Sequence, residues 1–287
     1  MSSHKASSWM ATAAMPTFVL LWGSAAIFTR WGLDHSSVLA LLVVRYVLAL
    51  GALLAIGLPR RNWWPEPGTR WQVAGTGLLL IAGYSVCYFQ AMAHGLTPGS
   101  LATLLGVQPI LTLLLTERDF SPWRLAGLVL ALMGLTLVVY QSITQAQISV
   151  LSLGFALGAL LAATFGAISQ KRIQQAPAQV LPLQYVVTLL VYLCLLPVQP
   201  FHFEASFGFL VPVLWLGLVI SVGAQLLLYR LIRSGNLVNV TSLFYLVPVV
   251  TVILDYLILG NAMPLLSLGG MVAILAGLTL VFKVPRP

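Results

Sequence analysis

The chain has 287 residues, of which 60% are hydrophobic and only 7% are charged. A water-soluble fold is excluded, because soluble domains carry about 25% charged residues to cover their surface. The net charge of +8 does not indicate a nucleic-acid partner, since the basic residues form no patch outside short loops. The composition is typical of a polytopic membrane protein whose surroundings are the lipid bilayer.

Apolar stretches of about 20 residues, the length that a helix needs to cross a bilayer, recur along the chain. They lack the alternation of barrel strands, so helices are predicted, which satisfy their own backbone groups in hydrocarbon. The first stretch lies behind Lys5 but is long and lacks an Ala-x-Ala-like cleavage site, which favours a helix over a signal peptide. In chain order, the ten predicted helices cover residues 9–29, 36–58, 71–93, 97–116, 122–140, 149–170, 179–199, 207–229, 237–258 and 264–283.

The positions of the basic residues predict the topology independently of hydropathy. If both termini lie on one side, every Lys and Arg except Arg30 and Arg45 falls on that side. Arg30 lies on the opposite side, and Arg45 lies inside the second predicted helix. The positive-inside rule therefore predicts a multi-pass protein of a bacterial-type inner membrane with cytoplasmic N- and C-termini.

The two halves of the sequence resemble each other at a spacing of about half the chain. Short motifs and prolines recur in the same order: GLTLV at 134–138 and 277–281, RYV at 45–47 against QYV at 184–186, Pro109 against Pro248, and Pro122 against Pro264. Since each half holds five helices, an odd number, the second copy must enter the membrane inverted. We therefore predict an all-α membrane protein of two inverted five-helix repeats, residues 1–145 and 146–287, around a central cavity. Such repeats work by alternating access.

Segments throughout the chain follow a known family pattern. They are LLWGSAAIFTRWG (20–32), RYVLA (45–49), Tyr88 with Ala91 and Gly95, QPILTLLLTE (108–117), PWRLAGLVLALMGLTLV (122–138), LYRLIRSG (228–235), YLVPVVTVIL (245–254) and GGMVAILAGLTLV (269–281). By their order and spacing, the chain resembles the drug/metabolite transporter superfamily in its ten-helix EamA-type branch. One departure is visible, because the family's glutamate after the fourth helix is Glu117, whereas the equivalent place after the ninth is Asn261.

Within that branch, the chain resembles bacterial amino-acid exporters, the YddG-type exporters of aromatic amino acids among them. The resemblance implies a transporter that exports amino acids and related metabolites, with aromatic amino acids the first expectation. The implied partner is a small-molecule substrate. A monomer is expected, with a dimer as the alternative. Export of drugs or of other metabolites is the alternative function within the transporters.

Arg45 is the one cation deep inside a predicted helix. It lies about nine residues into the second helix, or roughly 13 Å from its outer end. A charge at this depth costs about 2.5–3.5 kcal/mol on insertion scales, and it therefore faces a cavity or a partner. Two roles stay open: binding of a substrate carboxylate, and a structural role in which Arg45 bonds polar groups of neighbouring helices.

Two stripes of aromatic and polar residues mark candidate cavity walls. Tyr84 and Tyr88 share one face of the third helix, and Ser221, Gln225 and Tyr229 share one face of the eighth. If the stripes face each other, they would suit a substrate with a flat ring and polar ends, although an aromatic belt or ordinary packing would also explain them. The other candidates are Trp22, Gln108, Phe165, Ser169 and Tyr245 for the cavity, each with packing as the alternative, and Pro109 and Pro248 for helix kinks that serve as hinges.

Enzymatic function is not expected. The sequence has no H-E-x-x-H, no G-x-S-x-G, no pair of intramembrane aspartates and no Walker A motif, so no catalytic residue, metal or cofactor is assigned. A membrane-embedded enzyme and a structural membrane protein are the alternatives of another class. No carboxylate lies at a predicted midplane, so the usual acidic proton relay is missing, and transport is expected to be facilitative or coupled in another way.

Overall fold

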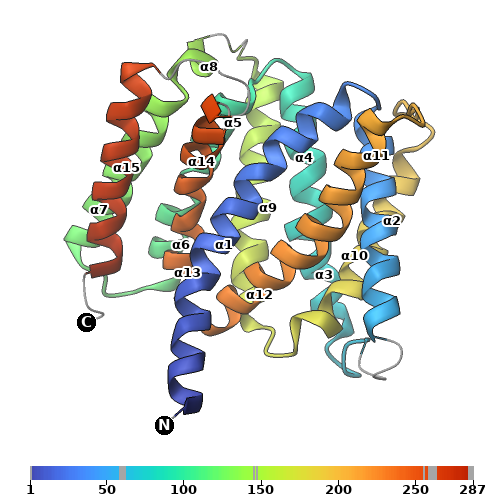
Figure 1. The fold of residues 1–287 in the computed structure, drawn as a ribbon, viewed down its shortest axis with the longest axis horizontal. Coiled ribbons are helices and arrows are strands. Elements are labelled where there is room, and N and C mark those ends of the chain that lie inside the picture. Colours follow the sequence, from blue (N-terminus) through green and yellow to red (C-terminus); the bar gives the residue numbers. More distant parts are fainter. Residues whose placement is uncertain are drawn as a thin grey trace. The chain divides into compact units, whose positions relative to one another are not determined.

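The computed structural model describes residues 2–57, 63–144, 146, 148–254, 256–257 and 264–283, and helices make up nearly all of its regular structure (Figure 1). The all-α fold is confirmed, and helices lie at all ten predicted places. Among the described residues, eight spans are long and apolar enough to cross a membrane, and α7 is a shorter apolar helix. The elements are α1 (Ser2–Leu33), α2 (Val38–Gly57), α3 (Arg70–Gly77), η2 (Leu78–Gly83), α4 (Tyr84–Ala93), α5 (Pro98–Leu105), α6 (Gln108–Thr116), α7 (Pro122–Val138), α8 (Tyr140–Thr144), α9 (Val150–Arg172), α10 (Pro177–Leu195), α11 (Phe207–Leu214), η3 (Trp215–Ala224), α12 (Gln225–Ser234), α13 (Leu237–Ser242), η4 (Leu243–Tyr245), α14 (Leu246–Leu254) and α15 (Leu265–Lys283).

Several helices begin where the local sequence favours a start. Pro98, Pro122 and Pro177 occupy the first positions of α5, α7 and α10, where a missing backbone N–H is of no consequence and the fixed φ suits a helix. The side chain of Thr97 caps α5, and that of Asn236 caps α13, each by accepting a bond from a backbone N–H of the first turn. These local signals explain why the predicted starts of these four helices lie within two residues of the observed ones.

The third and fourth helices of both repeats are interrupted at corresponding places. The third helix contains a π-helical segment in each repeat, η2 and η3, which ends directly before the predicted site residues Tyr84 and Gln225. The fourth helix breaks between α5 and α6 in the first repeat and passes through the 3-10 turn η4 in the second. Segments of π-helix are rare and occur frequently at functional sites, so their recurrence supports the predicted location of the site.

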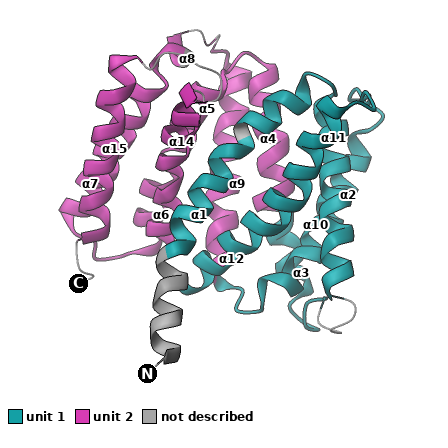
Figure 2. Ribbon diagram, viewed as in Figure 1, with its two compact units in different colours: residues 1–78, 172–235 teal, residues 79–171, 236–287 magenta. Residues whose placement is uncertain are grey.

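The chain forms two compact units, and each unit combines helices from both repeats (Figure 2). Unit 1 holds residues 1–78 and 172–235, and unit 2 holds residues 79–171 and 236–287. The compact units are therefore not the two halves of the sequence. The division into residues 1–145 and 146–287 remains a prediction about the repeats.

In unit 2, the fifth helices of the two repeats, α7 and α15, pack backbone to backbone. A Cβ added at Gly127 would lie 2.6 Å from the carbonyl oxygen of Gly277, and one added at Gly134 would lie 2.6 Å from that of Gly270. The shared GLTLV motif makes Gly134 the equivalent of Gly277, and Gly127 the equivalent of Gly270. The two contacts are thus one contact made in both directions, as in a two-fold interface. This pairing fits the inverted repeat.

We expect Gly270→Ala to destabilise the protein, because the new methyl group would lie 2.5 Å from the carbonyl oxygen of Gly134, and a backbone atom cannot move aside cheaply. The expected loss is about 1–3 kcal/mol, typical of an overpacked core. The neighbouring Gly269→Ala is a matched control in the same helix, since no atom lies within 4 Å of its added Cβ. Thermal unfolding in detergent measures both variants. Equal melting temperatures for the two would contradict the packing argument.

Candidate functional site

The second helices of the two repeats, α2 and α10, pack against each other in unit 1. Their corresponding tyrosines meet, with the ring of Tyr46 edge-on to the ring of Tyr185 at 4.9 Å between centroids. Tyr192 adds a third ring at 5.9 Å from Tyr46. All three tyrosines are buried. The RYV and QYV motifs of the sequence therefore mark a contact between the repeats.

Two glycines let the third helix of each repeat cross the second helix of the other. A Cβ added at Gly217 would lie 3.1 Å from the carbonyl oxygen of Arg45, and one added at Gly77 would lie 2.7 Å from the Cβ of Gln184. Gly77 and Gly217 are equivalent in the repeat, as are Arg45 and Gln184. The same helix crossing therefore occurs in both directions between the repeats. It places Arg45 and Gln184 at corresponding positions.

Arg45 is held by two groups of unit 1. Its Nε donates a hydrogen bond of 2.6 Å to the hydroxyl oxygen of Ser221, and its guanidinium carbon lies 5.2 Å from the centroid of the Tyr46 ring. The main-chain carbonyl of Ser221 accepts a hydrogen bond from the hydroxyl of Tyr185. Arg45 remains half-buried, and it forms no ion pair within the part of the chain that the structure describes.

The corresponding position of the second repeat holds an uncharged, buried residue, Gln184. Gln184 is fully buried, and its Oε1 accepts a hydrogen bond of 2.6 Å from the hydroxyl of Tyr229. Gln225 begins α12, one turn before Tyr229, and its side chain is half-buried. Ser221 and Tyr229 are each only 1% exposed, so two members of the predicted stripe make bonds inside unit 1. Sequence reasoning missed Gln184 and Tyr185 as their partners, although the QYV motif had marked both.

The other predicted stripe lies in unit 2. The rings of Tyr84 and Tyr88 are 5.7 Å apart on one face of α4, and both side chains are half-buried. Tyr88 packs against the apolar cluster that contains Leu101 and Ala156, whereas Tyr84 is not among its members. Since the two stripes belong to different units, their facing each other remains a prediction.

The interrupted fourth helices meet at their breaks in unit 2. The hydroxyl of Tyr245, in η4, donates a hydrogen bond to the carbonyl of Gly106, the residue that caps the C-terminal end of α5. Gln108 and the buried Pro109 begin α6 directly after this break, and Pro248 lies in the first turn of α14. The prolines thus stand beside real interruptions of the helices. Their role as hinges remains a prediction.

The remaining predicted residues have separate environments. Trp22 packs in unit 1 with its ring 5.2 Å from that of Phe18. Phe165 is 48% exposed on α9, in a row of exposed apolar side chains with Leu157 and Leu161. Ser169 lies one turn further along α9 and is half-buried. Phe165 and Ser169 belong to unit 2, whereas Trp22 belongs to unit 1 with Arg45.

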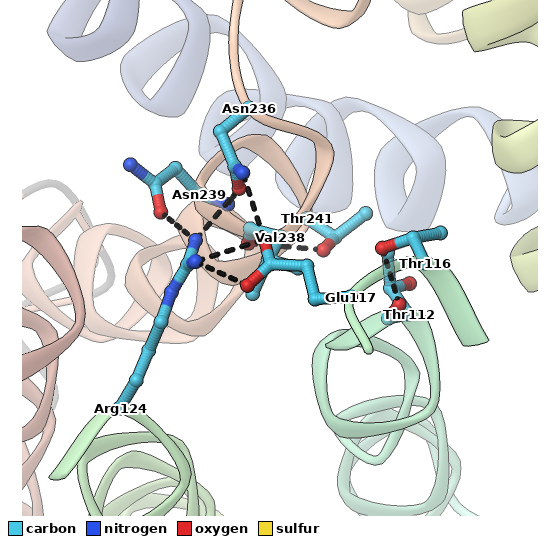
Figure 3. A network of polar contacts seen from close by, with 8 residues as sticks. All are labelled: Thr112, Thr116, Glu117, Arg124, Asn236, Val238, Asn239 and Thr241. Carbon is cyan, nitrogen blue, oxygen red and sulfur yellow. Dashed lines mark hydrogen bonds and ion pairs between the residues drawn. The ribbon is translucent and has the colours of Figure 1, made fainter. Parts of the chain in front are cut away.

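A buried polar network in unit 2 joins the end of α6 to the starts of α7 and α13 (Figure 3). Nη1 of Arg124 donates to both carboxylate oxygens of Glu117 at 2.8 and 2.6 Å, and Nη2 donates to the side-chain oxygens of Asn236 and Asn239 at 2.7 and 2.6 Å. Asn236 also donates to Glu117 at 2.8 Å. Arg124 is only 4% exposed, although the sequence analysis counted it only as one of the basic residues on the cytoplasmic side.

Both charges of this pair lie at unfavourable ends of their helices. Arg124 is in the first turn of α7, where the helix dipole repels a cation, and Glu117 follows the last turn of α6, where the dipole repels an anion. Each charge therefore depends on the other. A basic residue in a first helical turn, with an acid just after the preceding helix, is the signal that could have revealed the pair in the sequence.

Comparison with known proteins places the chain among transporters. The EamA-like transporter family matches it twice, over residues 9–140 and 150–283. A curated relative from Salmonella typhimurium, named "Probable amino-acid metabolite efflux pump", is 26% identical over 281 residues, which cover 91% of this chain and 90% of the relative. A solved crystal structure has a TM-score of 0.79 and 19% identity, and covers 95% of this chain and 98% of its own, which shows the shared fold.

We expect Glu117→Gln to lower stability strongly, because it leaves the buried guanidinium of Arg124 without a counter-charge. Breaking a buried pair costs about 3 kcal/mol. Glu204→Gln is the matched control, since Glu204 pairs with His35 but its side chain is 69% exposed, and exposed pairs contribute at most about 1 kcal/mol. Thermal unfolding of both variants tests this difference. A double variant, Glu117→Gln with Arg124→Gln, should recover part of the lost stability. If Glu117→Gln lowers the melting temperature no more than Glu204→Gln does, a structural role for the pair is contradicted.

Proposed function

This chain belongs to the EamA-like transporter family, and we propose that it exports amino acids and related metabolites, aromatic amino acids foremost, across an inner membrane by alternating access. The observation that carries the substrate class is the relative named as an amino-acid metabolite efflux pump, which matches this chain over nearly its whole length. The two family matches, one per repeat, support a transporter built from two copies of the family's repeat.

The side chains inside the helices supply chemistry that suits an aromatic amino acid. Such a substrate carries a carboxylate, an ammonium group and a flat ring. The half-buried rings of Tyr84 and Tyr88 offer aromatic faces to the ring and to the ammonium group. In this proposal, the substrate binds in a central cavity between the repeats.

The inverted repeat supports alternating access. Two inverted copies can exchange conformations, which opens the same binding site to either side of the membrane in turn. The breaks of the fourth helices, next to Pro109 and Pro248, are the proposed hinges, because residues 106–107 and η4 already interrupt the helical bonding there. The basic residues at the ends of the helices support cytoplasmic termini.

No mid-helix acid is available to carry protons in the part of the chain that the structure describes. Its acidic residues are Asp34, Glu66, Glu117, Asp119 and Glu204, and each lies outside the helices. Asp255 and Asn261 lie outside the described residues. We therefore propose facilitated export down the gradient of the substrate itself.

Counterflow in proteoliposomes tests the proposed function. Vesicles are loaded with one unlabelled amino acid, and uptake of the same labelled compound is followed without any ion gradient. We expect counterflow of tryptophan, tyrosine and phenylalanine that exceeds that of alanine and is missing from protein-free vesicles. If the folded, inserted protein gives no counterflow with any amino acid, the amino-acid assignment is wrong, and drugs or other metabolites become the candidates.

Tyr84→Ala is expected to weaken the handling of aromatic substrates. Loss of one aromatic contact is worth about 0.5–1.5 kcal/mol, which corresponds to a rise of about 2- to 12-fold in the KM of counterflow for tryptophan. Tyr140→Ala is the matched control, because Tyr140 is a tyrosine at the surface, 49% exposed and outside the proposed cavity. Equal KM values for the two variants would remove Tyr84 from the proposed cavity.

A further inference from the structure

Arg45 carries a charge deep in a membrane span, and none of the described residues supplies a counter-charge to it. It lies seven residues after the start of α2, or roughly 11 Å along the helix. Among the described residues, the ion pairs are those of Arg124 with Glu117 and of His35 with Glu204. A charge at such a depth is expensive unless it faces a polar space or a partner. Arg45 is half-buried rather than fully enclosed, so part of its side chain remains accessible.

The protein occupies only part of the guanidinium group. Nε donates to Ser221, and one face of the group lies over the ring of Tyr46. No described residue accepts a hydrogen bond from the two terminal amino groups, Nη1 and Nη2. These two groups form the flat fork that binds a carboxylate through two parallel hydrogen bonds. Nη1 and Nη2 are thus left for a ligand, while Nε is anchored to Ser221.

The anchoring groups are themselves fixed by Tyr185. Its hydroxyl donates to the carbonyl of Ser221, and its ring packs edge-on against Tyr46. Ser221 belongs to the π-helical segment η3, so its backbone lies in an interruption of the regular helix. One buried tyrosine from the second repeat therefore holds both contacts of Arg45. This arrangement orients the guanidinium before any ligand arrives, as a binding site requires.

The second repeat shows what packing alone needs at this position. Gln184, the equivalent of Arg45, is fully buried and bonded to Tyr229. A neutral amide thus suffices where a third helix crosses a second helix at Gly77. The positive charge of Arg45 is therefore additional to the requirements of the helix crossing.

From these observations, we infer that Nη1 and Nη2 of Arg45 bind the carboxylate of the transported substrate, and that Ser221 and Tyr46 are positioning residues for the guanidinium. The inference rests on the proposed function for the class of substrate, an amino acid. It assigns one end of that substrate to unit 1, next to the contact between α2 and α10.

The test compares three ligands that share an indole ring: tryptophan, indole-3-propionate, which has the carboxylate alone, and tryptamine, which has the amine alone. Binding to the purified full-length protein in detergent is measured from the ligand dependence of thermal unfolding. For the wild-type protein, we expect both carboxylates to bind at least about 10-fold more tightly than tryptamine, as for a charge-assisted pair.

Three variants separate the charge from its geometry. Arg45→Gln introduces the residue type found at the equivalent position, and it should reduce carboxylate affinity about 10-fold or more, with little change for tryptamine. Arg45→Lys keeps the charge but loses the fork, and Ser221→Ala loses the anchor of Nε, so both should give intermediate losses. Arg172→Gln removes one charge at the exposed end of α9 and is the matched control, with wild-type affinities expected.

The inference is overturned if the wild-type protein binds tryptamine as tightly as the carboxylates or binds none of the three ligands. It is also overturned if folded Arg45→Gln keeps the wild-type preference. Should Arg45→Gln fail to fold, the ligand series on the wild-type protein and on Ser221→Ala still decides. Preference for carboxylates without amino-acid counterflow would reject the proposed function and support the carboxylate site. Amino-acid counterflow without a preference for carboxylates would support the proposed function and reject the carboxylate site.

Discussion

Close contact between equivalent helices of the two repeats is the constraint on which each compact unit depends. Lipid chains are as apolar as leucine, so apolar side chains alone do not draw helices together in a membrane, and close packing must do so. In unit 2, the glycines of α7 and α15 bring the two backbones into direct contact. In unit 1, α2 and α10 meet through buried tyrosines instead, and glycines bring the third helices across them. Each glycine contact occurs twice because the repeat is inverted.

Two arginines show how their surroundings give one residue type different roles. Arg124 is almost fully buried, and its terminal amino groups are taken up by Glu117, Asn236 and Asn239, so it ties three helix ends together. Arg45 is anchored by a bond from Nε to Ser221 and by the ring of Tyr46, and it remains half-buried. A satisfied buried charge stabilises structure, whereas an oriented charge without a counter-charge remains available to a ligand.

The two repeats share their backbone features but differ in their charges. The backbone features recur, including the crossing glycines, the π-helical segments and the breaks of the fourth helices. The charges do not recur, since Arg45 corresponds to Gln184. Alternating access needs only a symmetric backbone, because the two copies exchange conformations. A substrate with distinct ends, such as an amino acid, needs different groups on the two sides of its site.

The sequence by itself determined the helices, the repeat and the family, because each depends on local or regular signals: apolar runs of membrane length, prolines at helix starts, and motifs such as GLTLV in a fixed order. It also marked RYV and QYV without revealing that Tyr46 and Tyr185 touch. Only the tertiary structure decided which helices share a compact unit, that Arg124 is buried, and that Ser221 holds Arg45. These features depend on contacts between residues far apart in the chain, and neither the apolar pattern nor helix propensity carries information about which faces of two helices meet.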